Sequence, residues 1–373
     1  MKILFVEPHE SSLFSFRKEL LDTLIRDGHD VVLCIQSTEK IVNEYSKVLK
    51  IIDVPMNLKD KGIRTNLKLK HKYKRIIREE KPDLILSYKI KPNIYCGLYA
   101  KKIPMIANIT GLGNMFKSDG LLSRLGVFLY RKSFKNIEYV FFQNSDGLDF
   151  FKSNKIRINN YRIIPGSGVN LSRYSPAPLI NDGVIKFLFA SRALEEKGFN
   201  LLTKAIPLVI ARHKNVHFNF LSAEESVSSD KFFLSIYEQY KNFISILDRV
   251  EDMSNIYSNN SFLVSPSYYR EGISNVLLES LACGRPIITT KDNPGCKEVL
   301  VEGVNGFGVL SKDLNSLVHS LSVASELSAQ EIEKMGLMGR QFVEKNFDRQ
   351  IVINNYLEII DIIRRRQHNI NNS

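Results

Sequence analysis

Short apolar runs alternate with helical patterns along most of this chain, and the alternation occurs twice. Runs of this kind, five to eight residues long and rich in Val, Ile, Leu and Phe, are typical of strands in a parallel sheet that is covered on both faces. Helical patterns lie at about 14–27, 198–213 and 229–242, and the chain is helical in pattern after about 313. The sequence therefore predicts an α/β fold. The runs lie at 2–6, 30–35, 83–88, 105–110, 139–143 and 161–165, and again at 184–191, 216–221, 243–248, 262–267 and 286–290.

The length of 373 residues suits two domains rather than one. The stretch GSGVNLSRYSPAP (166–178) interrupts the alternation with Gly, Ser and Pro, which is typical of a linker. We expect a first domain at 1–165, a linker at 166–182, and a second domain at 183–349. Ligands of such domains sit at the carboxyl ends of the strands, so a cleft between the two domains is expected to hold the site.

The positive charge is concentrated in the first half of the chain. Residues 1–165 carry 30 Lys and Arg against 17 Asp and Glu, whereas residues 166–373 carry 22 against 23. The stretch 59–102 alone carries 14 basic and 4 acidic side chains. This asymmetry indicates an anionic partner for the first half: a membrane surface, a phosphate-bearing substrate or a nucleic acid.

The four cysteines are scattered and form no CxxC or Cys/His cluster, so neither a zinc site nor a disulfide framework is indicated. A reducing cytoplasm is the simplest compartment. The apolar run at the amino terminus is too short for a signal peptide, and no run approaches the ~18 apolar residues of a membrane-spanning helix.

The segment SRALEEKG (191–198) directly follows a predicted strand. Its Arg192 and Lys197 can therefore reach a ligand at the carboxyl end of the sheet. A guanidinium fork and an ammonium point charge together suit a diphosphate. The alternative is an ordinary solvated loop, in which Glu195 and Glu196 balance these charges.

Two glutamates, Glu271 and Glu279, bracket the start of a predicted helix in REGISNVLLESLACG (270–284). We expect Gly272, Ile273 and Ser274 to form its first turn, where backbone N–H groups and the helix dipole favour an anion. The two carboxylates would lie ~12 Å apart along the helix axis. Glu279 has apolar neighbours and needs hydrogen-bond donors, which ribose hydroxyls would supply. In the alternative, Glu271 is an ordinary helix N-terminal acid and Glu279 pairs with a nearby cation.

These stretches resemble one family when they are taken in order. REGISNVLLESLACGRPIITT is similar to the E-x7-E motif of retaining glycosyltransferases of family 4, which have the GT-B fold of two tandem Rossmann-like domains facing a cleft. NPGCKEVLVEGVNGF (293–307), SRALEEKG, GSGVNLSRYSP and ITGLGNMF (109–116) match in the right order. The combination resembles bacterial enzymes that extend O-antigen, capsule or other glycan chains on a lipid diphosphate.

The resemblance implies a hexosyl- or N-acetylhexosaminyltransferase that uses a nucleotide-sugar, with a UDP-sugar as the expected donor. It also implies that a last helix, at about 350–373, packs back on the first domain. Two loops depart from the family pattern: EPHESSLFSF (7–16) replaces a glycine-rich loop, and LSAEES (221–226) lacks a glycine. The implied donor residues are Arg192 and Lys197 for the diphosphate, Glu271 and the backbone of Gly272, Ile273 and Ser274 for the sugar and phosphates, Glu279 for the ribose, and Arg249 and Val250 for the base.

Glu271, Arg192 and Lys197 are the expected catalytic residues. The sequence contains no Asp-x-Asp, so we expect no metal and no cofactor, with Arg192, Lys197 and the helix N-terminus stabilising the leaving diphosphate. In a retaining transfer on one face, the leaving phosphate oxygen can take the proton of the acceptor, so no His base is required. His9, Thr110, Gly111 and Gly113 are the expected acceptor contacts, His9 against the alternative of an ordinary loop histidine.

A membrane surface is the expected docking partner of the basic half. In NLKLKHKYKRIIREEK (66–81), Leu69, Tyr73, Ile76 and Ile77 share one helical face, which leaves a basic face outside. With LLSRLGVFLYRKSFK (121–135), this segment predicts peripheral attachment to the inner face of the cell membrane, where a lipid-diphosphate-linked acceptor would be reached. A merely solvated basic face is the alternative.

Two other functions stay open. A GT-B sugar-nucleotide epimerase would need several carboxylates around one sugar, and only Glu271 is evident. A non-catalytic polyanion-binding protein would use the basic half, but no nucleic-acid motif is present, so no nucleic acid is expected as a partner.

Overall fold

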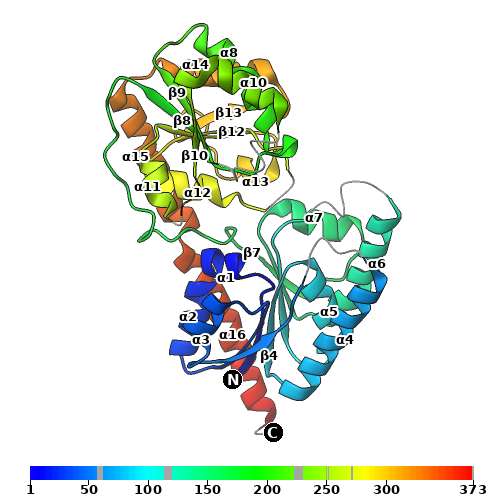
Figure 1. The fold of residues 1–373 in the computed structure, drawn as a ribbon. Coiled ribbons are helices and arrows are strands. Elements are labelled where there is room, and N and C mark those ends of the chain that lie inside the picture. Colours follow the sequence, from blue (N-terminus) through cyan, green and yellow to red (C-terminus); the bar gives the residue numbers. More distant parts are fainter. Residues whose placement is uncertain are drawn as a thin grey trace. The chain divides into compact units, whose positions relative to one another are not determined.

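Two units make up the molecule, each built around one parallel sheet (Figure 1). The structure is a computed structural model that describes residues 1–56, 62–112, 120–221, 230–248, 250, 252–269 and 272–371. Unit 1 comprises Met1–Ser167 with Val352–Ser373, and unit 2 comprises Gly168–Ile351.

The sheet of unit 1 has seven strands in the order β3-β2-β1-β4-β5-β6-β7, and every pairing is parallel. Its central strands are the long Val/Ile/Leu/Phe runs, because only central strands are buried on both faces. The strands are β1 (Lys2–Val6), β2 (Asp30–Ile35), β3 (Lys50–Asp53), β4 (Leu84–Tyr88), β5 (Met105–Ile109), β6 (Tyr139–Phe142) and β7 (Asn160–Ile163).

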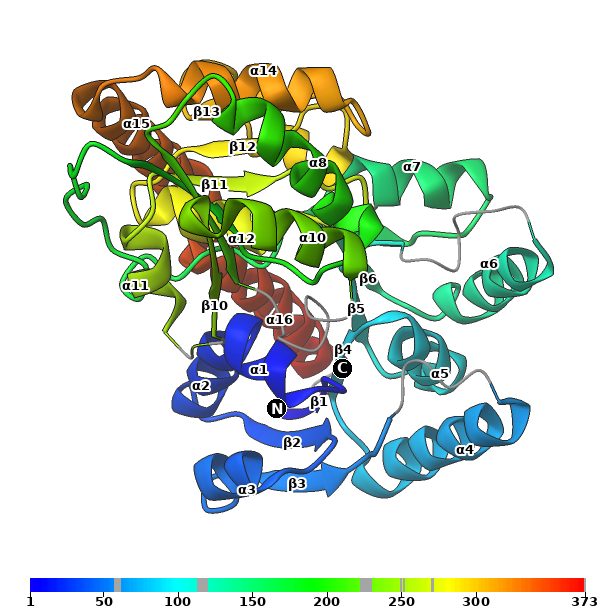
Figure 2. The same cartoon turned by 45° about the horizontal axis from the view of Figure 1, so that its top comes forward.

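Helices cover both faces of this sheet. Alternate strand residues such as Leu4 and Val6 face α4 (Ile63–Glu80), α5 (Ile90–Ala100), α6 (Leu121–Phe134) and α7 (Ser145–Ser153). Figures 1 and 2 both show α4, α5 and α6 side by side. The other set, such as Ile3 and Phe5, faces α1 (Glu10–Phe16), α2 (Lys18–Arg26), α3 (Glu39–Tyr45) and α16 (Arg349–Asn371).

The inward face predicted for the basic segment 66–81 is confirmed. Leu69, Tyr73, Ile76 and Ile77 of α4 are all buried against the sheet, and charged side chains such as Lys68, Lys74 and Arg78 are exposed.

The helix α16 packs on unit 1 through a buried aromatic cluster from Val352 onward. The ring of Tyr356 lies 4.6 Å from that of Phe141 on β6, and its hydroxyl oxygen accepts a hydrogen bond of 2.5 Å from Asn108 Nδ2 on β5. At the surface, Glu358 pairs with both terminal nitrogens of Arg162 on β7. A single helix thus supplies both an aromatic core element and a paired carboxylate to this sheet.

Unit 2 has a sheet of six parallel strands in the order β10-β9-β8-β11-β12-β13. The strands are β8 (Ile185–Phe189), β9 (Val216–Leu221), β10 (Ile244–Leu247), β11 (Phe262–Ser265), β12 (Ile287–Thr290) and β13 (Gly306–Val309). One face carries a phenylalanine-rich core beneath α8 (Phe199–Ile210), α10 (Lys231–Tyr240) and α14 (Leu314–Ser325). The other face packs on α11 (Met253–Ser258), α12 (Asn275–Ala282) and part of α15 (Ala329–Phe347). The remaining described elements are α13 (Pro294–Lys297) and the short 3₁₀ helices η2 (Glu195–Lys197) and η3 (Lys241–Phe243).

Two strands were not predicted from the sequence, and both lie at sheet edges. The strand β3 (KIID) is four residues long and half exposed, so its sequence lacks a continuous apolar run. The strand β13 (GFGV) contains glycines, which are rare in strands. Gly306 is required there, because an added Cβ would lie 2.0 Å from the carbonyl oxygen of Ile287 on β12.

A second glycine brings two loops of unit 2 together. Gly198 ends η2 in the left-handed region, with φ +80°, and an added Cβ would lie 2.5 Å from both the Cγ and the carbonyl oxygen of Pro266. The segment after β8 and the segment after β11 can therefore touch only while residue 198 has no side chain.

We expect Gly198→Ala to lower the stability of unit 2 by at least about 2 kcal/mol, because left-handed strain of ~1–2 kcal/mol adds to the collision with Pro266. Gly183→Ala is the matched control, since Gly183 has φ +78° and nothing within 4 Å of an added Cβ. Differential scanning calorimetry should show a larger fall in melting temperature for Gly198→Ala. Equal falls would mean that Pro266 yields freely and that the contact does not hold the loops.

Candidate active site

Three loops of unit 2 meet at the carboxyl ends of the neighbouring strands β8, β11 and β12. The loop after β8 contacts the loop after β11 through one carbonyl group. Glu196 O accepts hydrogen bonds from the Tyr268 N–H at 3.0 Å and from the Ser267 hydroxyl at 3.3 Å. The first loop contains the SRALEEKG stretch, and the second leads toward α12, so the fold brings SRALEEKG beside the segment that precedes the second motif.

Asn293, in the loop after β12, joins the cluster through its side chain. Its side-chain amide donates to the carbonyl oxygens of Ser267 at 2.7 Å and Tyr269 at 3.1 Å. Ser267 O also accepts from the Thr290 hydroxyl at 2.5 Å. Asn293 is buried, and within the described part of the chain its Oδ1 has no hydrogen-bond partner. Asn293 was not predicted as a site residue, although its place after the apolar strand β12 could have indicated it.

Arg192 and Lys197 both lie on the loop after β8, as the sequence predicts. Arg192 is exposed, and Lys197 is partly buried with its ammonium 5.0 Å from the ring centroid of Tyr269. The cation–π contact holds Lys197 toward the loop after β11. Both cations thus lie on the carboxyl side of the sheet.

The prediction that Gly272, Ile273 and Ser274 form the first turn of the helix is wrong. The helix α12 begins at Asn275, and Ser274 is its N-cap with an extended backbone, φ −77° and ψ 110°. Gly272 and Ile273 therefore precede the helix, with Ile273 buried in the core of unit 2. The Ser274 N–H donates to the Gly295 carbonyl at 3.2 Å, so Ser274 contributes no N–H to a ligand in this conformation.

Glu279 lies on α12 and receives its hydrogen bonds from tyrosines. The Tyr257 hydroxyl donates to Glu279 Oε2 at 2.8 Å, and the Tyr174 hydroxyl is a second donor. Burial raises the pKa of Glu279. These hydrogen bonds and the charges of Arg349 and Arg173 act in the opposite direction and lower it. The two tyrosine hydroxyls therefore supply some of the hydrogen-bond donors that were expected from a ribose. Neither tyrosine was predicted, because both are distant from Glu279 in sequence.

Three predicted site residues, Glu271, Arg249 and Gly113, lie outside the described residues. Val250, the other residue predicted at the base, is 37% exposed beyond the end of β10.

The predicted acceptor residues lie on unit 1. His9 follows β1 as the N-cap of α1 and is partly exposed, and Thr110 and Gly111 follow β5. Burial lowers the pKa of His9, and the charge of Lys89 lowers it further. Because β1 and β5 flank β4 in a parallel sheet, all three residues share its carboxyl edge. Lys89, which follows β4 at the same edge, was not predicted.

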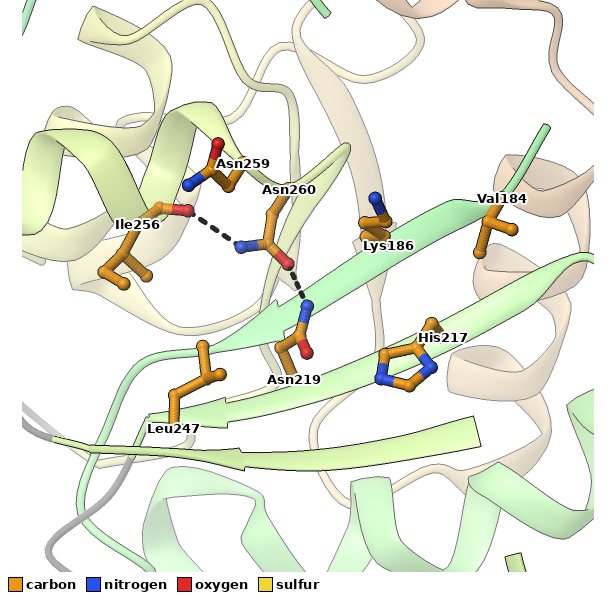
Figure 3. A pocket seen from close by; sticks show the side chains of 8 residues that line it. All are labelled: Val184, Lys186, His217, Asn219, Leu247, Ile256, Asn259 and Asn260. Atoms are coloured by element: carbon orange, nitrogen blue, oxygen red, sulfur yellow. Dashed lines mark hydrogen bonds between the residues drawn. The ribbon is translucent and has the colours of Figure 1, made fainter. Parts of the chain in front are cut away.

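A hollow of about 420 Å³ occurs elsewhere in unit 2 (Figure 3). Lys186 and His217, near the starts of β8 and β9, line it together with Asn219, whose amide donates to Asn260 at 2.7 Å. This hollow lies along the face of the sheet, and it contains none of the predicted site residues. The candidate active site is thus the loop cluster and not this pocket.

Among the described residues, no three His, Cys, Asp or Glu side chains gather as a metal-binding group.

Comparison with known proteins identifies both halves of the chain. A family model described as glycosyl transferases group 1 matches residues 185–325, and one described as glycosyl transferase 4-like matches residues 2–144. Together they cover most of the chain, and both describe transferases. These two matches favour a glycosyltransferase over an epimerase or a polyanion-binding protein.

The chain matches a curated relative and several solved structures nearly end to end. The N,N'-diacetylbacillosaminyl-diphospho-undecaprenol alpha-1,3-N-acetylgalactosaminyltransferase of Campylobacter jejuni is 24% identical over 383 aligned positions, covering 97% of this chain and 98% of the relative. A glycosyltransferase from Rickettsia africae superposes with a TM-score of 0.77 at 20% identity, covering 97% and 98% of the two chains. Anabaena HepE, solved with UDP and glucose, gives 0.76 at 16% identity, covering 97% and 99%.

The structural likenesses confirm the predicted GT-B fold, and the family models account for both sheets that build it. The chain belongs to the GT-B glycosyltransferases of family 4.

Proposed function

We propose that this glycosyltransferase moves a hexosyl or N-acetylhexosaminyl group from a UDP-sugar, with retention of configuration, to a lipid-diphosphate-linked acceptor in cell-surface glycan assembly. The observation that carries the donor half is the loop cluster of unit 2, in which Arg192 and Lys197 share the carboxyl edge of the sheet with the loop before α12. The Campylobacter relative, by its name, acts on a diphospho-undecaprenol-linked sugar, and this supports the acceptor half. O-antigen and capsule assembly are the processes that the proposal covers.

The donor is proposed to lie across the loop cluster, with its diphosphate at Arg192 and Lys197. A guanidinium and an ammonium neutralise the charge that develops on a leaving diphosphate, which is the task that a metal ion performs in other transferases. The reaction is therefore proposed to need no metal. In the same pose, Glu271 would contact the sugar, Arg249 and Val250 the base, and Glu279 the ribose through the oxygen lone pairs that Tyr257 and Tyr174 leave available.

We expect UDP to raise the melting temperature of the protein in the presence of EDTA, and to do so more than GDP or ADP. Arg192→Ala and Lys197→Ala should each weaken UDP binding by about 10- to 100-fold, because a hydrogen bond to a charged group contributes ~1.5–3 kcal/mol. Isothermal titration calorimetry measures the affinities.

The control for these variants is Lys204→Ala, which removes an exposed cation from α8 of the same unit. Unchanged UDP affinity in both loop variants would remove Arg192 and Lys197 from the donor site. A need for added Mg²⁺ or Mn²⁺ would contradict the metal-free reaction.

Glu271→Ala should lower kcat by at least about 100-fold, as the loss of a group that stabilises the transition state does, and should weaken UDP-sugar binding much less. Steady-state kinetics read beside calorimetry separate these two effects. If binding and turnover fall together, Glu271 only positions the donor.

We also propose that the protein docks on an anionic membrane, and the helix α6 supports this. Its exposed apolar side chains form one stripe, with Leu121 85%, Leu122 58%, Leu125 51% and Phe128 58% exposed. Arg124, Arg131 and Lys132 on the same helix are exposed. Apolar side chains with flanking cations suit the interface of an anionic leaflet. Among the described residues, no helix combines the length and the hydropathy needed to cross a bilayer, and the proposed location is the cytoplasmic face of the membrane.

The double variant Leu125→Ser/Phe128→Ser should reduce flotation with phosphatidylglycerol-containing vesicles at least tenfold, because each apolar side chain that enters the lipid contributes ~1.5–3 kcal/mol.

Replacing Lys70, Lys72 and Lys74 with Gln should weaken flotation at low salt and have less effect at high salt.

Leu337→Ser/Met338→Ser is the matched control, since these residues are 56% and 41% exposed on α15 of unit 2. Equal flotation of all variants and of the unaltered protein would reject this docking surface.

A further inference from the structure

Glu7, Arg17 and Lys89 form a cluster of charges at the carboxyl edge of the unit 1 sheet. Glu7 directly follows β1, and Lys89 directly follows the neighbouring strand β4, where Val6 and Ser87 are paired in register. Arg17 joins α1 to α2 and places its guanidinium carbon 4.6 Å from the ring centroid of Tyr88. One carboxylate therefore faces two cations.

The two charges at the base of the cluster are buried and incompletely paired. Glu7 is 1% exposed and Arg17 is 3% exposed. In the part of the chain that the structure describes, Glu7 Oε1 and Arg17 Nε have no hydrogen-bond partner. Lys89 is partly exposed, so it is the member of the cluster that a ligand can reach. The groups packed around them, the hydroxyls of Tyr88 and Tyr356 and the imidazole of His9, bring no further negative charge, because burial raises the pKa of both tyrosines and lowers that of His9.

The backbone at Lys89 is strained. Its φ of 73° with ψ of 159° lies in a region that glycine occupies almost alone. Lys89 is also the N-cap of the eleven-residue helix α5, and its carbonyl accepts from the Asn93 N–H at 3.1 Å. The positive end of the α5 dipole therefore adds to the ammonium. A lysine where glycine would fit without strain indicates that its side chain is used.

The cluster carries one more positive than negative charge, and this partly buried excess charge favours a counter-ion. Burial lowers the pKa of Lys89, whereas Glu7 raises it. A bound anion would stabilise the charged ammonium further. His9, Thr110 and Gly111, which are the predicted acceptor residues, share this edge of the sheet.

We propose that Lys89, positioned by Glu7 and Arg17, binds the diphosphate of the lipid-linked acceptor. This rests on the proposed function, whose acceptor carries that group. Lys89 would be an acceptor-binding residue, and Glu7 and Arg17 would be positioning residues that do not touch the ligand.

Farnesyl diphosphate, a short prenyl diphosphate, is the probe, and saturating UDP occupies the donor site during its titration by calorimetry. Lys89→Gly removes the ammonium and suits the backbone conformation, so the fold should be retained. We expect it to weaken binding of farnesyl diphosphate at least tenfold and to leave UDP affinity unchanged. Lys89→Arg should stay within about threefold of the unaltered protein.

Lys155→Gly is the matched control, because Lys155 is an exposed lysine of unit 1 that also has a positive φ, 51°, and this variant should bind farnesyl diphosphate normally. No binding by the unaltered protein, or equal binding by Lys89→Gly, would overturn the proposal. Binding of inorganic diphosphate without binding of farnesyl diphosphate would overturn the assignment to a lipid carrier. If UDP fails to bind while Lys89-dependent binding of farnesyl diphosphate persists, the proposed donor site fails and this inference stands.

Discussion

The carbonyl of Glu196 is the point on which the candidate site depends. It accepts hydrogen bonds from Ser267 and Tyr268, and it can do so because Gly198 lets the two backbones meet at Pro266. Arg192 and Lys197 stand on one side of this junction, and the loop leading into α12 stands on the other. The Asn293 side chain holds the loop after β11 by donating hydrogen bonds to the carbonyl oxygens of Ser267 and Tyr269. Backbone groups therefore set the spacing of the charged side chains, so the charges need little direct contact with one another.

Glu279 shows how a carboxylate is kept in an apolar setting. Tyr257 and Tyr174 supply donors, and Arg349 and Arg173 supply opposing charge at longer range. The tyrosine hydroxyls stay protonated, because burial raises the pKa of Tyr257 far above its usual range. The carboxylate is thereby held in one orientation, which would lower the conformational cost of binding the proposed donor.

Much of the architecture could be read from the order of residues. The apolar runs of β1, β8 and β12 predict buried parallel strands, because these strands need apolar side chains on both faces. The edge strands β3 and β13 carry no such requirement, and they were not predicted. The position of Arg192 and Lys197 at the carboxyl end of the sheet could be predicted because they lie in the loop that follows an apolar strand. Tyr174, Tyr257 and Arg17 were not found, because their roles come from contacts between residues far apart in the chain. The start of α12 was placed too early, since a Gly-Ile-Ser stretch can form either a first turn or an extended entry.

The helix α16 also constrains how the length of this chain can vary. Its first residues belong to unit 2, where the Arg349 N–H donates to the Val169 carbonyl, and its later residues belong to unit 1, where Tyr356, Ile359 and Ile360 are buried. One residue inserted between Tyr356 and Ile359 would turn everything beyond it by about 100°, which would carry Ile359 and Ile360 out of the core of unit 1 while Tyr356 stays beside Asn108. Insertions and deletions should therefore be rare in α16 among related sequences, and more frequent in exposed segments such as 180–183, where no helical phase has to be kept.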